Sequence, residues 1–468
     1  MHLYPTENET IVGTARAIRD GKLSCVDVVN RCLANIDARE HEVHAWVGVD
    51  REGALNQAHV LDQELASGLD RGHLHGIPFG IKDIIDVAGW PTGAGFAPCI
   101  DHIAEDDAPL VACLRSAGAI ILGKTVTTAF AWIDPPITRN PWNLERTPGG
   151  SSSGSAAAVA CGMCLGALGT QTGGSVIRPA SFCGVVGFKP DHQSLSTTGI
   201  VPFATSLDTP GLFARSVQDL YLTYRQLLAE RFNKSTDHRF QDPSTWKLFA
   251  EQPKSIGRAP EVIRERADFS MKGALDFAYR AIAAAGTEVI DIPLPLDFDA
   301  FHPIHRTIMA VEAAEAHETT LATYRDQLPP QIRAIWEEGL AISGLRYVRA
   351  LNQSKAWCLD FFDEALSRAQ GEAFVEFLIM PAAIGAAPAP STTGDPWMNS
   401  PWTMLGHAVL TIPAGLDAEG MPLGIQLVAC SNSHVGRSHH LAATRRLFAE
   451  AYWIEQTIQQ SLSQKIEK

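Results

Sequence analysis

The sequence lacks long hydrophobic runs and any excess of positive charge. No apolar stretch approaches the roughly 20 residues that cross a bilayer. The 38 Lys and Arg residues are outnumbered by 52 Asp and Glu residues, which gives a formal net charge of −14. Because nucleic-acid surfaces need clustered Lys and Arg, we expect neither a membrane nor a nucleic-acid partner.

Secretory and metal-binding patterns are also missing. The first residues have no basic segment followed by an apolar one, so they do not resemble a signal peptide. The nine cysteines are odd in number and scattered, as in proteins that keep reduced thiols. The 16 histidines show no metal-ligand spacing. These features predict a cytoplasmic location and no metal or other cofactor.

The order of the expected elements indicates an α/β fold. A helix over about 107–117 is followed by an apolar strand, and the same order recurs over 156–168 and 271–292. From 301 to about 369 the pattern is almost entirely helical, which predicts a cap over a sheet. Further apolar strands are expected over 374–380, 409–412 and 424–428.

Residues Gly118 to Thr125 match the phosphate-binding pattern G-x-x-x-x-G-K-T, with Lys124 in the lysine position. A phosphate loop needs small, solvent-facing residues whose backbone N–H groups can point at phosphate. The intervening residues are Ala, Ile, Ile and Leu, which are typical of a buried strand. We therefore favour a strand, and a nucleotide-binding protein remains only as an alternative of another class.

Two further short motifs have simple structural explanations. The nucleophile-elbow pattern G-x-S-x-G occurs around Ser152, but the preceding residues are turn-like where a strand is required. Asp395 and His407 follow in the right order, with nothing specific around them. Cys161 and Cys164 form C-x-x-C inside a run of small residues, where core packing is the simpler interpretation.

Two clusters of glycine and serine dominate the middle of the sequence. The first runs from Gly149 to Ser155, the second from Thr172 to Ser175, and a stretch of small residues over 156–165 separates them. A buried helix over that stretch would pack closely enough to return the second cluster beside the first. The two glycines before Ser175 can turn successive N–H groups toward one point. Ser175 is therefore a candidate nucleophile, although the same glycines would also suit an ordinary tight turn.

Lys82 is the candidate base. A free lysine has a pKa of about 10.4 and must lose solvation to accept protons at neutral pH. Its apolar neighbours offer burial, and strand alternation directs Asp83 to the opposite face, where it cannot hold Lys82 charged. Taken alone, a lysine at a strand end would more often extend its amine into water.

These segments together resemble the amidase signature enzymes. The resemblance runs in order through three motifs: Gly76-Ile-Pro-Phe-Gly-Ile-Lys82-Asp, the Gly149 cluster with its following alanines, and Thr172-Gly-Gly-Ser175-Val-Ile-Arg178. It continues through Gly187-Phe-Lys-Pro, Ser206-Leu-Asp-Thr, Pro401-Trp-Thr and Pro422-Leu-Gly-Ile-Gln-Leu. It weakens between about 230 and 370. Three spaced motifs in order are far more specific than any one of them.

The resemblance implies a Ser-cisSer-Lys triad. In such a triad Ser175 would attack the carbonyl, Ser151 on a cis peptide would relay its proton, and Lys82 would be the base. The resulting acyl-enzyme would be released by water. Backbone N–H groups that would hold the oxyanion belong to Thr172, Gly173, Gly174 and Ser175.

The resemblance also implies the architecture. A central mixed, twisted β-sheet would be covered by helices on both faces and would carry a helical cap-like insertion. We expect one domain over 1–468. Its parts would be N-terminal helices (1–70), a catalytic core (71–225), a divergent, mostly helical cap or substrate region (about 230–370) and a return to the core sheet (371–468).

Departures from the family pattern bear on the substrate. The family often has Gly at the position of Ser153 and Asp at that of Gln171, and both changes should leave the triad intact. Members commonly have Glu at the position of Ala129, in a segment that borders the substrate site. Losing this carboxylate among aromatic neighbours favours an apolar substrate, although these neighbours could equally be core residues. The expected pocket residues are Ala129, Phe130, Trp132, Ile133, Gly150, Trp397 and Met398.

We therefore predict a stand-alone hydrolase of aryl or alkyl amides, of the aryl acylamidase or urethanase type. Carbamates and esters are further candidate substrates because the same acyl-enzyme chemistry serves them. The main alternative is the glutaminase component of a tRNA-dependent amidotransferase, which needs partner subunits and a pocket for a glutamine carboxylate. Ala129 and the divergent 230–370 region weigh against it. A small-molecule amide or carbamate is the expected partner, and a homodimer is left open.

Overall fold

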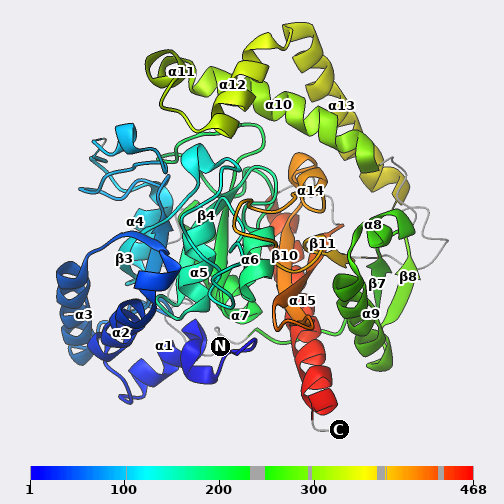
Figure 1. Cartoon of the computed structure of the whole chain (residues 1–468). Coiled ribbons are helices and arrows are strands. Elements are labelled where there is room, and N and C mark those ends of the chain that lie inside the picture. Colours follow the sequence, from blue (N-terminus) through cyan, green and yellow to red (C-terminus); the bar gives the residue numbers. More distant parts are fainter. Residues whose placement is uncertain are drawn as a thin grey trace.

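The computed structural model describes residues 2–101, 103–231, 248–292, 298–365, 375, 377–430 and 437–466. Its strands all belong to one sheet of 11 strands (Figure 1). They are β1 (Trp46–Val49), β2 (Pro78–Lys82), β3 (Ile120–Thr125), β4 (Gly166–Gln171), β5 (Val186–Lys189), β6 (Thr209–Ala214), β7 (Ser255–Arg258), β8 (Glu288–Asp291), β9 (Phe377–Pro381), β10 (Val409–Leu416) and β11 (Pro422–Ala429).

The sheet mixes parallel and antiparallel pairs in the order β1-β3-β2-β4-β6-β5-β10-β11-β9-β7-β8. β3, β2 and β4 are parallel to one another, and so are β9, β7 and β8 near the other edge. The strands between β4 and β9 pair antiparallel, and β1 is antiparallel to β3. Only the parallel pairs need long crossover connections, which accounts for the helices that alternate with these strands.

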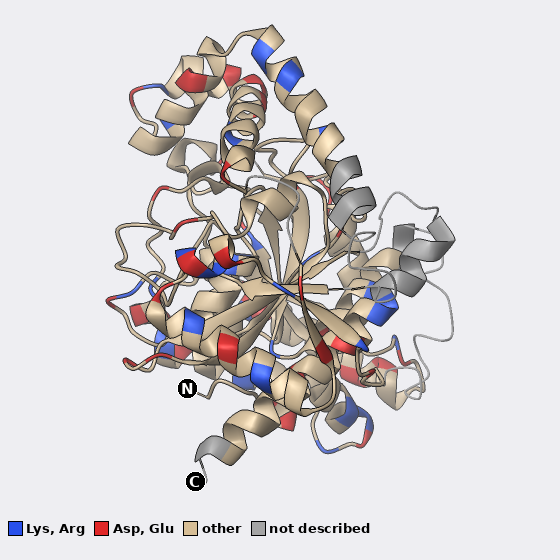
Figure 2. Cartoon of the chain, turned by 90° about the vertical axis from the view of Figure 1, so that its right-hand side faces the viewer, with Lys and Arg blue, Asp and Glu red and all other residues tan. Residues whose placement is uncertain are grey.

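Helices cover both faces of the sheet. On one face α5 and α6 pack together against the central strands, and on the other α7, α9 and α15 do so. Figure 2 shows that charged residues lie mainly on the peripheral helices and loops. The helices outside the cap are α1 (Ile11–Arg19), α2 (Cys25–Val43), α3 (Arg51–Ala66), α4 (Pro109–Ser116), α5 (Ser153–Ala160), α6 (Ile177–Cys183), α7 (Val217–Arg231), α8 (Glu261–Arg266), α9 (Phe269–Ala284), α14 (Ser400–Met404) and α15 (Arg437–Ile466).

Four consecutive helices form a cap beyond one end of the strands, at the top of Figure 1. They are α10 (Phe301–Ala316), α11 (Glu318–Tyr324), α12 (Pro330–Ala341) and α13 (Gly344–Ala365). The predictions of a mixed sheet, of helices on both faces and of a helical cap are therefore confirmed. The end of the expected helical stretch at 366–369, the first residue of the strand expected at 374, and residues 232–247 of the divergent region lie outside the described residues.

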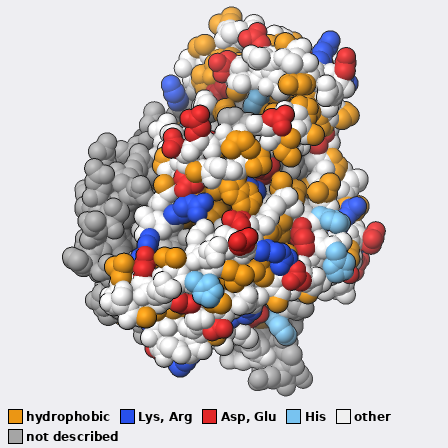
Figure 3. Space-filling view, turned by 90° about the vertical axis from the view of Figure 1, so that its left-hand side faces the viewer, with side chains coloured by type: hydrophobic (Ala, Val, Ile, Leu, Met, Phe, Trp, Pro, Cys, Tyr) orange, Lys and Arg blue, Asp and Glu red, His pale blue; other side chains and the backbone are white. Residues whose placement is uncertain are grey.

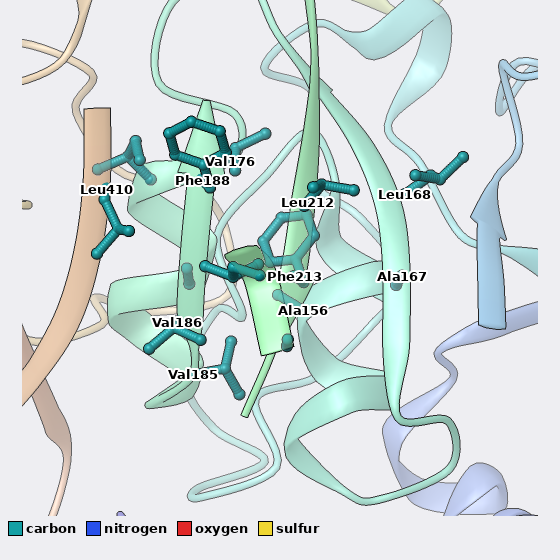
Figure 4. Packing of buried hydrophobic residues seen from close by; sticks show 14 of the residues in the cluster. Ala156, Ala167, Leu168, Val176, Val185, Val186, Phe188, Leu212, Phe213 and Leu410 are labelled. Atoms are coloured by element: carbon teal, nitrogen blue, oxygen red, sulfur yellow. The ribbon is translucent and has the colours of Figure 1, made fainter. Parts of the chain in front are cut away.

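Apolar side chains from neighbouring strands and from α5 form the core (Figure 4). Phe188 on β5 and Leu212 and Phe213 on β6 are at most 1% exposed, and Ala156 of α5 packs in the same cluster. The small residues of α5 let this helix approach the sheet closely, because a Cβ atom at Gly154 would lie 2.2 Å from the backbone oxygen of Ala45. This close packing returns the second glycine-serine cluster beside the first.

The helix predicted over 156–165 is shorter than expected. It ends at Ala160, and Gly162 then adopts a left-handed φ of 65° that only glycine accepts easily. The chain needs this turn to enter β4 between β2 and β6. Cys161 and Cys164 consequently lie in the turn rather than inside a helix, and both are free thiols.

The phosphate-binding pattern is a buried strand, as favoured from the sequence. All of β3 is buried, and Lys124 Nζ donates to the carbonyl oxygen of Pro91 (3.1 Å) and pairs with Asp83 (3.3 Å). Its amine is therefore committed to the loop after β2, and Gly118 to Thr125 forms no phosphate loop.

The surface and the helices supply two further findings. On the face shown in Figure 3, basic and acidic side chains are interspersed rather than gathered by sign. Among the described helices, none has the length and hydropathy needed to cross a membrane. Within the same residues no cluster of His, Cys, Asp and Glu side chains is arranged to hold a metal ion.

Candidate active site

The candidate site lies where two parallel strands end. β2 ends at Lys82 and the neighbouring β4 ends at Gln171, with Ile81 opposite Leu168 in the register. The carboxyl ends of parallel strands meet at the same edge of a sheet, where open α/β sheets bind ligands. The first turn of α5 reaches this edge too, because Ser152 Oγ bonds with the backbone of Thr170 (3.2 Å to its oxygen).

Lys82 is fully buried and bonded to two hydroxyl groups. Its Nζ lies 2.8 Å from Ser151 Oγ and 2.8 Å from Thr170 Oγ1. Burial lowers the pKa of Lys82 to about 7, against an opposing charge effect of Asp208. Asp83 points the other way, toward Lys124, as strand alternation predicted.

Asp208 is the acidic group that acts on Lys82. Its carboxylate accepts hydrogen bonds from the N–H groups of Phe203 (2.7 Å) and Ala204 (3.0 Å), and from Thr172 Oγ1 (2.5 Å). Burial nevertheless raises the pKa of Asp208 to about 6. The carboxylate is thus fixed by neutral donors, and no cation pairs with it among these contacts.

The backbone around Ser151 is held on both sides. The Gly150–Ser151 peptide bond is cis. Arg178 Nη2 donates to the carbonyl oxygen of Gly150 at 2.9 Å, and the N–H of Thr128 donates to that of Ser151 at 3.3 Å. Burial lowers the pKa of Arg178 to about 10, which still leaves it charged at neutral pH. A side chain at position 150 would collide with Thr393, whose Cγ2 would lie 2.6 Å from the added Cβ.

Ser175 lies between β4 and α6, in the four-residue segment Thr172–Ser175, which we call the nest. Its side chain is partly exposed, whereas Ser151 is buried. Within the described chain no hydrogen bond joins the hydroxyls of these two serines. Gln171 braces the start of α6, because its Oε1 accepts from the N–H groups of Val176 (2.9 Å) and Ile177 (3.0 Å).

A cavity of about 150 Å³ adjoins Thr170 and Thr172. Most of its wall is apolar, and its one charged lining residue is Asp208. It is lined by Ile84, Ala131, Thr170, Thr172, Thr197, Ile200, Val201, Pro202, Phe203, Thr205, Asp208, Thr209 and Pro210.

None of the seven predicted pocket residues is among the lining residues of this cavity. Trp132 lies directly behind its wall and stacks on Phe203, with ring centroids 5.1 Å apart. Phe130 packs edge-on against His317 and Trp336 of the cap. The others are packed around the site: Ala129 and Met398 are buried, Ile133 is half-buried, Gly150 precedes Ser151, and Trp397 contacts Phe298.

The nucleophile elbow is not formed. Ser152 follows an irregular segment instead of a strand, and its hydroxyl bonds with the Thr170 backbone. His407 Nδ1 bonds with the carbonyl oxygen of Ala429, and Asp395 accepts from the N–H of Trp397. The three side chains therefore form no triad.

Sequence reasoning missed Thr170, Asp208 and His305 as parts of the site. Thr170 had a usable signal, since a hydroxyl near the end of the strand before the nest faces the same edge as Lys82. Asp208 was recognised only as part of a motif. His305 gave no signal, because it lies in the divergent helical region and reaches the nest only through the folded cap: its Nε2 is 2.8 Å from the carbonyl oxygen of Thr172.

The Amidase family model matches residues 27–434, so the chain belongs to the amidase family. Its structural neighbours are amidases as well, and the protein is a hydrolase that acts on the carbon–nitrogen bonds of amides, as predicted.

Three particular proteins show the range of this likeness. The chain is 31% identical to the A component of the glutamyl-tRNA(Gln) amidotransferase of Carboxydothermus hydrogenoformans, over 88% of this chain and 91% of that protein. The crystal structure of an amidase has a TM-score of 0.82 at 29% identity, covering 95% of this chain and 99% of that one. The peptide amidase of Stenotrophomonas maltophilia has a TM-score of 0.81 at 27% identity, covering 96% and 97%.

Proposed function

We propose that the protein is a stand-alone amidase in which Ser175 is the nucleophile, Ser151 relays the proton and Lys82 is the base. The observation that carries the proposal is the 2.8 Å hydrogen bond between buried Lys82 Nζ and Ser151 Oγ. With a pKa of about 7, a large share of Lys82 is neutral at neutral pH and can accept a proton.

The reaction starts when Ser175 attacks the carbonyl carbon. Ser151 takes the proton of Ser175 while neutral Lys82 takes that of Ser151. Backbone N–H groups of the nest stabilise the oxyanion. As the C–N bond breaks, Ser151 gives a proton to the leaving nitrogen and regains one from Lys82. Water then attacks the acyl-enzyme through the same relay, which releases the acid and restores Ser175.

The adjoining cavity supports an uncharged substrate. A cavity of about 150 Å³ holds a benzene-sized group, which matches the volume beside Thr170 and Thr172. No Lys or Arg is among its lining residues, and Asp208 would repel a carboxylate there. Anilides, benzyl amides and the corresponding carbamates and esters are therefore the proposed substrate classes.

The glutaminase component of a tRNA-dependent amidotransferase is the second candidate. Its support is the identity of 31–32% to the A components of such amidotransferases over most of both chains. This function would require partner subunits and a cation for the glutamine carboxylate outside the cavity described above.

A substrate panel with the purified protein alone separates the two candidates. We expect hydrolysis of anilides, primary amides or carbamates and no appreciable ammonia release from glutamine. Glutamine hydrolysis that exceeds every other activity, or that appears only with added amidotransferase subunits, would favour the second candidate.

The roles of the serines are tested on the best substrate of that panel. Ser175→Ala should lower kcat at least about 10³-fold, because the nucleophile is lost. Ser152→Ala is the matched control and should retain activity, since its hydroxyl bonds only with the Thr170 backbone. Full activity of Ser175→Ala would refute the mechanism.

A further inference from the structure

Three consecutive carbonyl groups of the nest are each held by a donor. The oxygen of Thr172 bonds with His305 Nε2 at 2.8 Å, and that of Gly173 accepts from Thr403 Oγ1 at 2.7 Å. The oxygen of Gly174 accepts from the N–H of Arg178 at 3.0 Å. Every carbonyl between Thr172 and Ser175 therefore has a fixed direction.

Fixing the carbonyls also fixes the N–H groups that follow them. In a planar trans peptide the C=O and the next N–H point in opposite directions. The N–H groups of Gly173, Gly174 and Ser175 thus point away from His305 and Thr403, and within the described residues none of them has an acceptor. Unpaired N–H groups that face a common side are what an oxyanion hole requires.

The donors come from different parts of the chain. Arg178 belongs to α6, which begins directly after the nest, so its bond is local. His305 lies on α10 of the cap and Thr403 on α14, far along the sequence. The nest itself has two glycines and little intrinsic preference for one conformation, so these two remote donors have the larger influence on its shape.

We propose that His305 and Thr403 are positioning residues for the oxyanion hole, which couples the cap to catalysis. The inference rests on the proposed function, because it assumes that the nest receives the oxyanion. Neither residue needs to touch the substrate. Each holds a peptide plane so that its N–H points to where negative charge develops.

The protonation of both donors agrees with this role. Burial lowers the pKa of His305 to about 4, so the ring is neutral at neutral pH. Since a carbonyl oxygen can only accept, Nε2 must carry the ring proton. Gln171 Nε2 lies 3.0 Å from Thr403 Oγ1 and can only donate to it, which leaves the Thr403 proton for the Gly173 oxygen.

The test uses pairs of variants that remove or retain each donor. His305→Leu and Thr403→Val lose it, whereas His305→Gln and Thr403→Ser keep an N–H or O–H near the same place. We expect the first two to lower kcat about tenfold, with KM changed less than about twofold, because a lost neutral hydrogen bond has effects of this size. The retaining variants should recover most of the loss.

A trifluoromethyl ketone analogue of the best substrate supplies a readout that a merely structural role would not move. Its tetrahedral adduct with Ser175 carries an oxyanion, so its affinity should fall by about the same factor as kcat/KM in the losing variants. Arg306→Gln is the matched control on α10. It removes an exposed ion pair with Glu338 inside the cap and should change neither quantity.

The outcomes separate this inference from the proposed function. An active Ser175→Ala variant would defeat the proposed function itself. If Ser175→Ala is inactive while Thr403→Val keeps its kcat and its inhibitor affinity, only the positioning role is wrong. Thr403→Val is nearly isosteric, so it keeps the test decisive even if His305→Leu does not fold. A change in KM alone would also overturn the inference.

Discussion

At the scale of single residues, Lys82 has the ionisation that the fold changes with the clearest consequence for activity. Because burial lowers its pKa to about 7, the neutral base forms as the pH rises through this value. We expect kcat/KM to increase with pH and to level off above about pH 8, since kcat/KM reports ionisations of the free enzyme. A profile with its midpoint near 10 would mean that the amine is solvated in solution.

Asp208 provides a second test at this scale. Its negative charge raises the pKa of Lys82, so Asp208→Asn should move the midpoint of the kcat/KM profile to lower pH. The measurement is the pH dependence of kcat/KM for both proteins, with thermal melting to verify folding. A midpoint that stays in place or moves upward would show that Asp208 does not act on Lys82.

At the scale of elements, two glycines in helices predict opposite effects of the same substitution. Gly154→Ala in α5 would place a Cβ 2.2 Å from a backbone oxygen, and it should destabilise the fold by at least about 3 kcal/mol. Gly273→Ala in α9 meets nothing within 4 Å and should stabilise by about 1 kcal/mol through helix propensity. Urea unfolding measures both values, and similar effects at the two positions would contradict the packing of α5.

The glycines and serines of the site show how far the sequence could lead. The close packing of α5 followed from its small residues, and the burial of Lys82 followed from its apolar neighbours on β2. The end of α5 was misjudged because Gly162, not loss of apolar character, stops it. The turn at Phe130 and Ala131 had no signal at all, since both take left-handed φ values (47° and 61°) that non-glycine residues seldom adopt.

The cap illustrates the same limit at the next level. Its helices were readable from their periodicity, because each buries one face. Which of their side chains reach the nest was not readable, since that depends on how α10 is placed over the ends of the strands. His305 and Trp397 were therefore harder to judge than Lys82, which sits in a contiguous apolar strand.

At the scale of the whole molecule, buried carboxyl groups should make stability depend on pH. Glu455 of α15 accepts from the N–H of Val217, and burial raises its pKa to about 8. The folded state then holds a proton that the unfolded chain releases above about pH 4.3. Stability falls with pH wherever the folded state binds more protons, here by up to about 1.4 kcal/mol per pH unit between about pH 5 and 8.

Glu455→Gln should remove this slope and raise the melting temperature at pH 8 relative to the parent protein. Lys82 acts in the opposite direction only above about pH 7, because its lowered pKa makes the folded state release a proton first. The exposed Glu265→Gln substitution is the control. An unchanged slope in Glu455→Gln would mean that the carboxyl is ionised in the folded protein.

The short strand β8 has a consequence for how copies of this protein meet. It forms one edge of the sheet and presents the exposed carboxylates of Glu288 and Asp291. An unpaired strand edge is a template for adding a strand from another chain, and charged side chains counter such pairing. Two copies approaching along β8 would bring like charges together before any ladder formed. Self-association of this protein must therefore use its helical surfaces, and a fibre that grows by sheet extension is disfavoured at this edge.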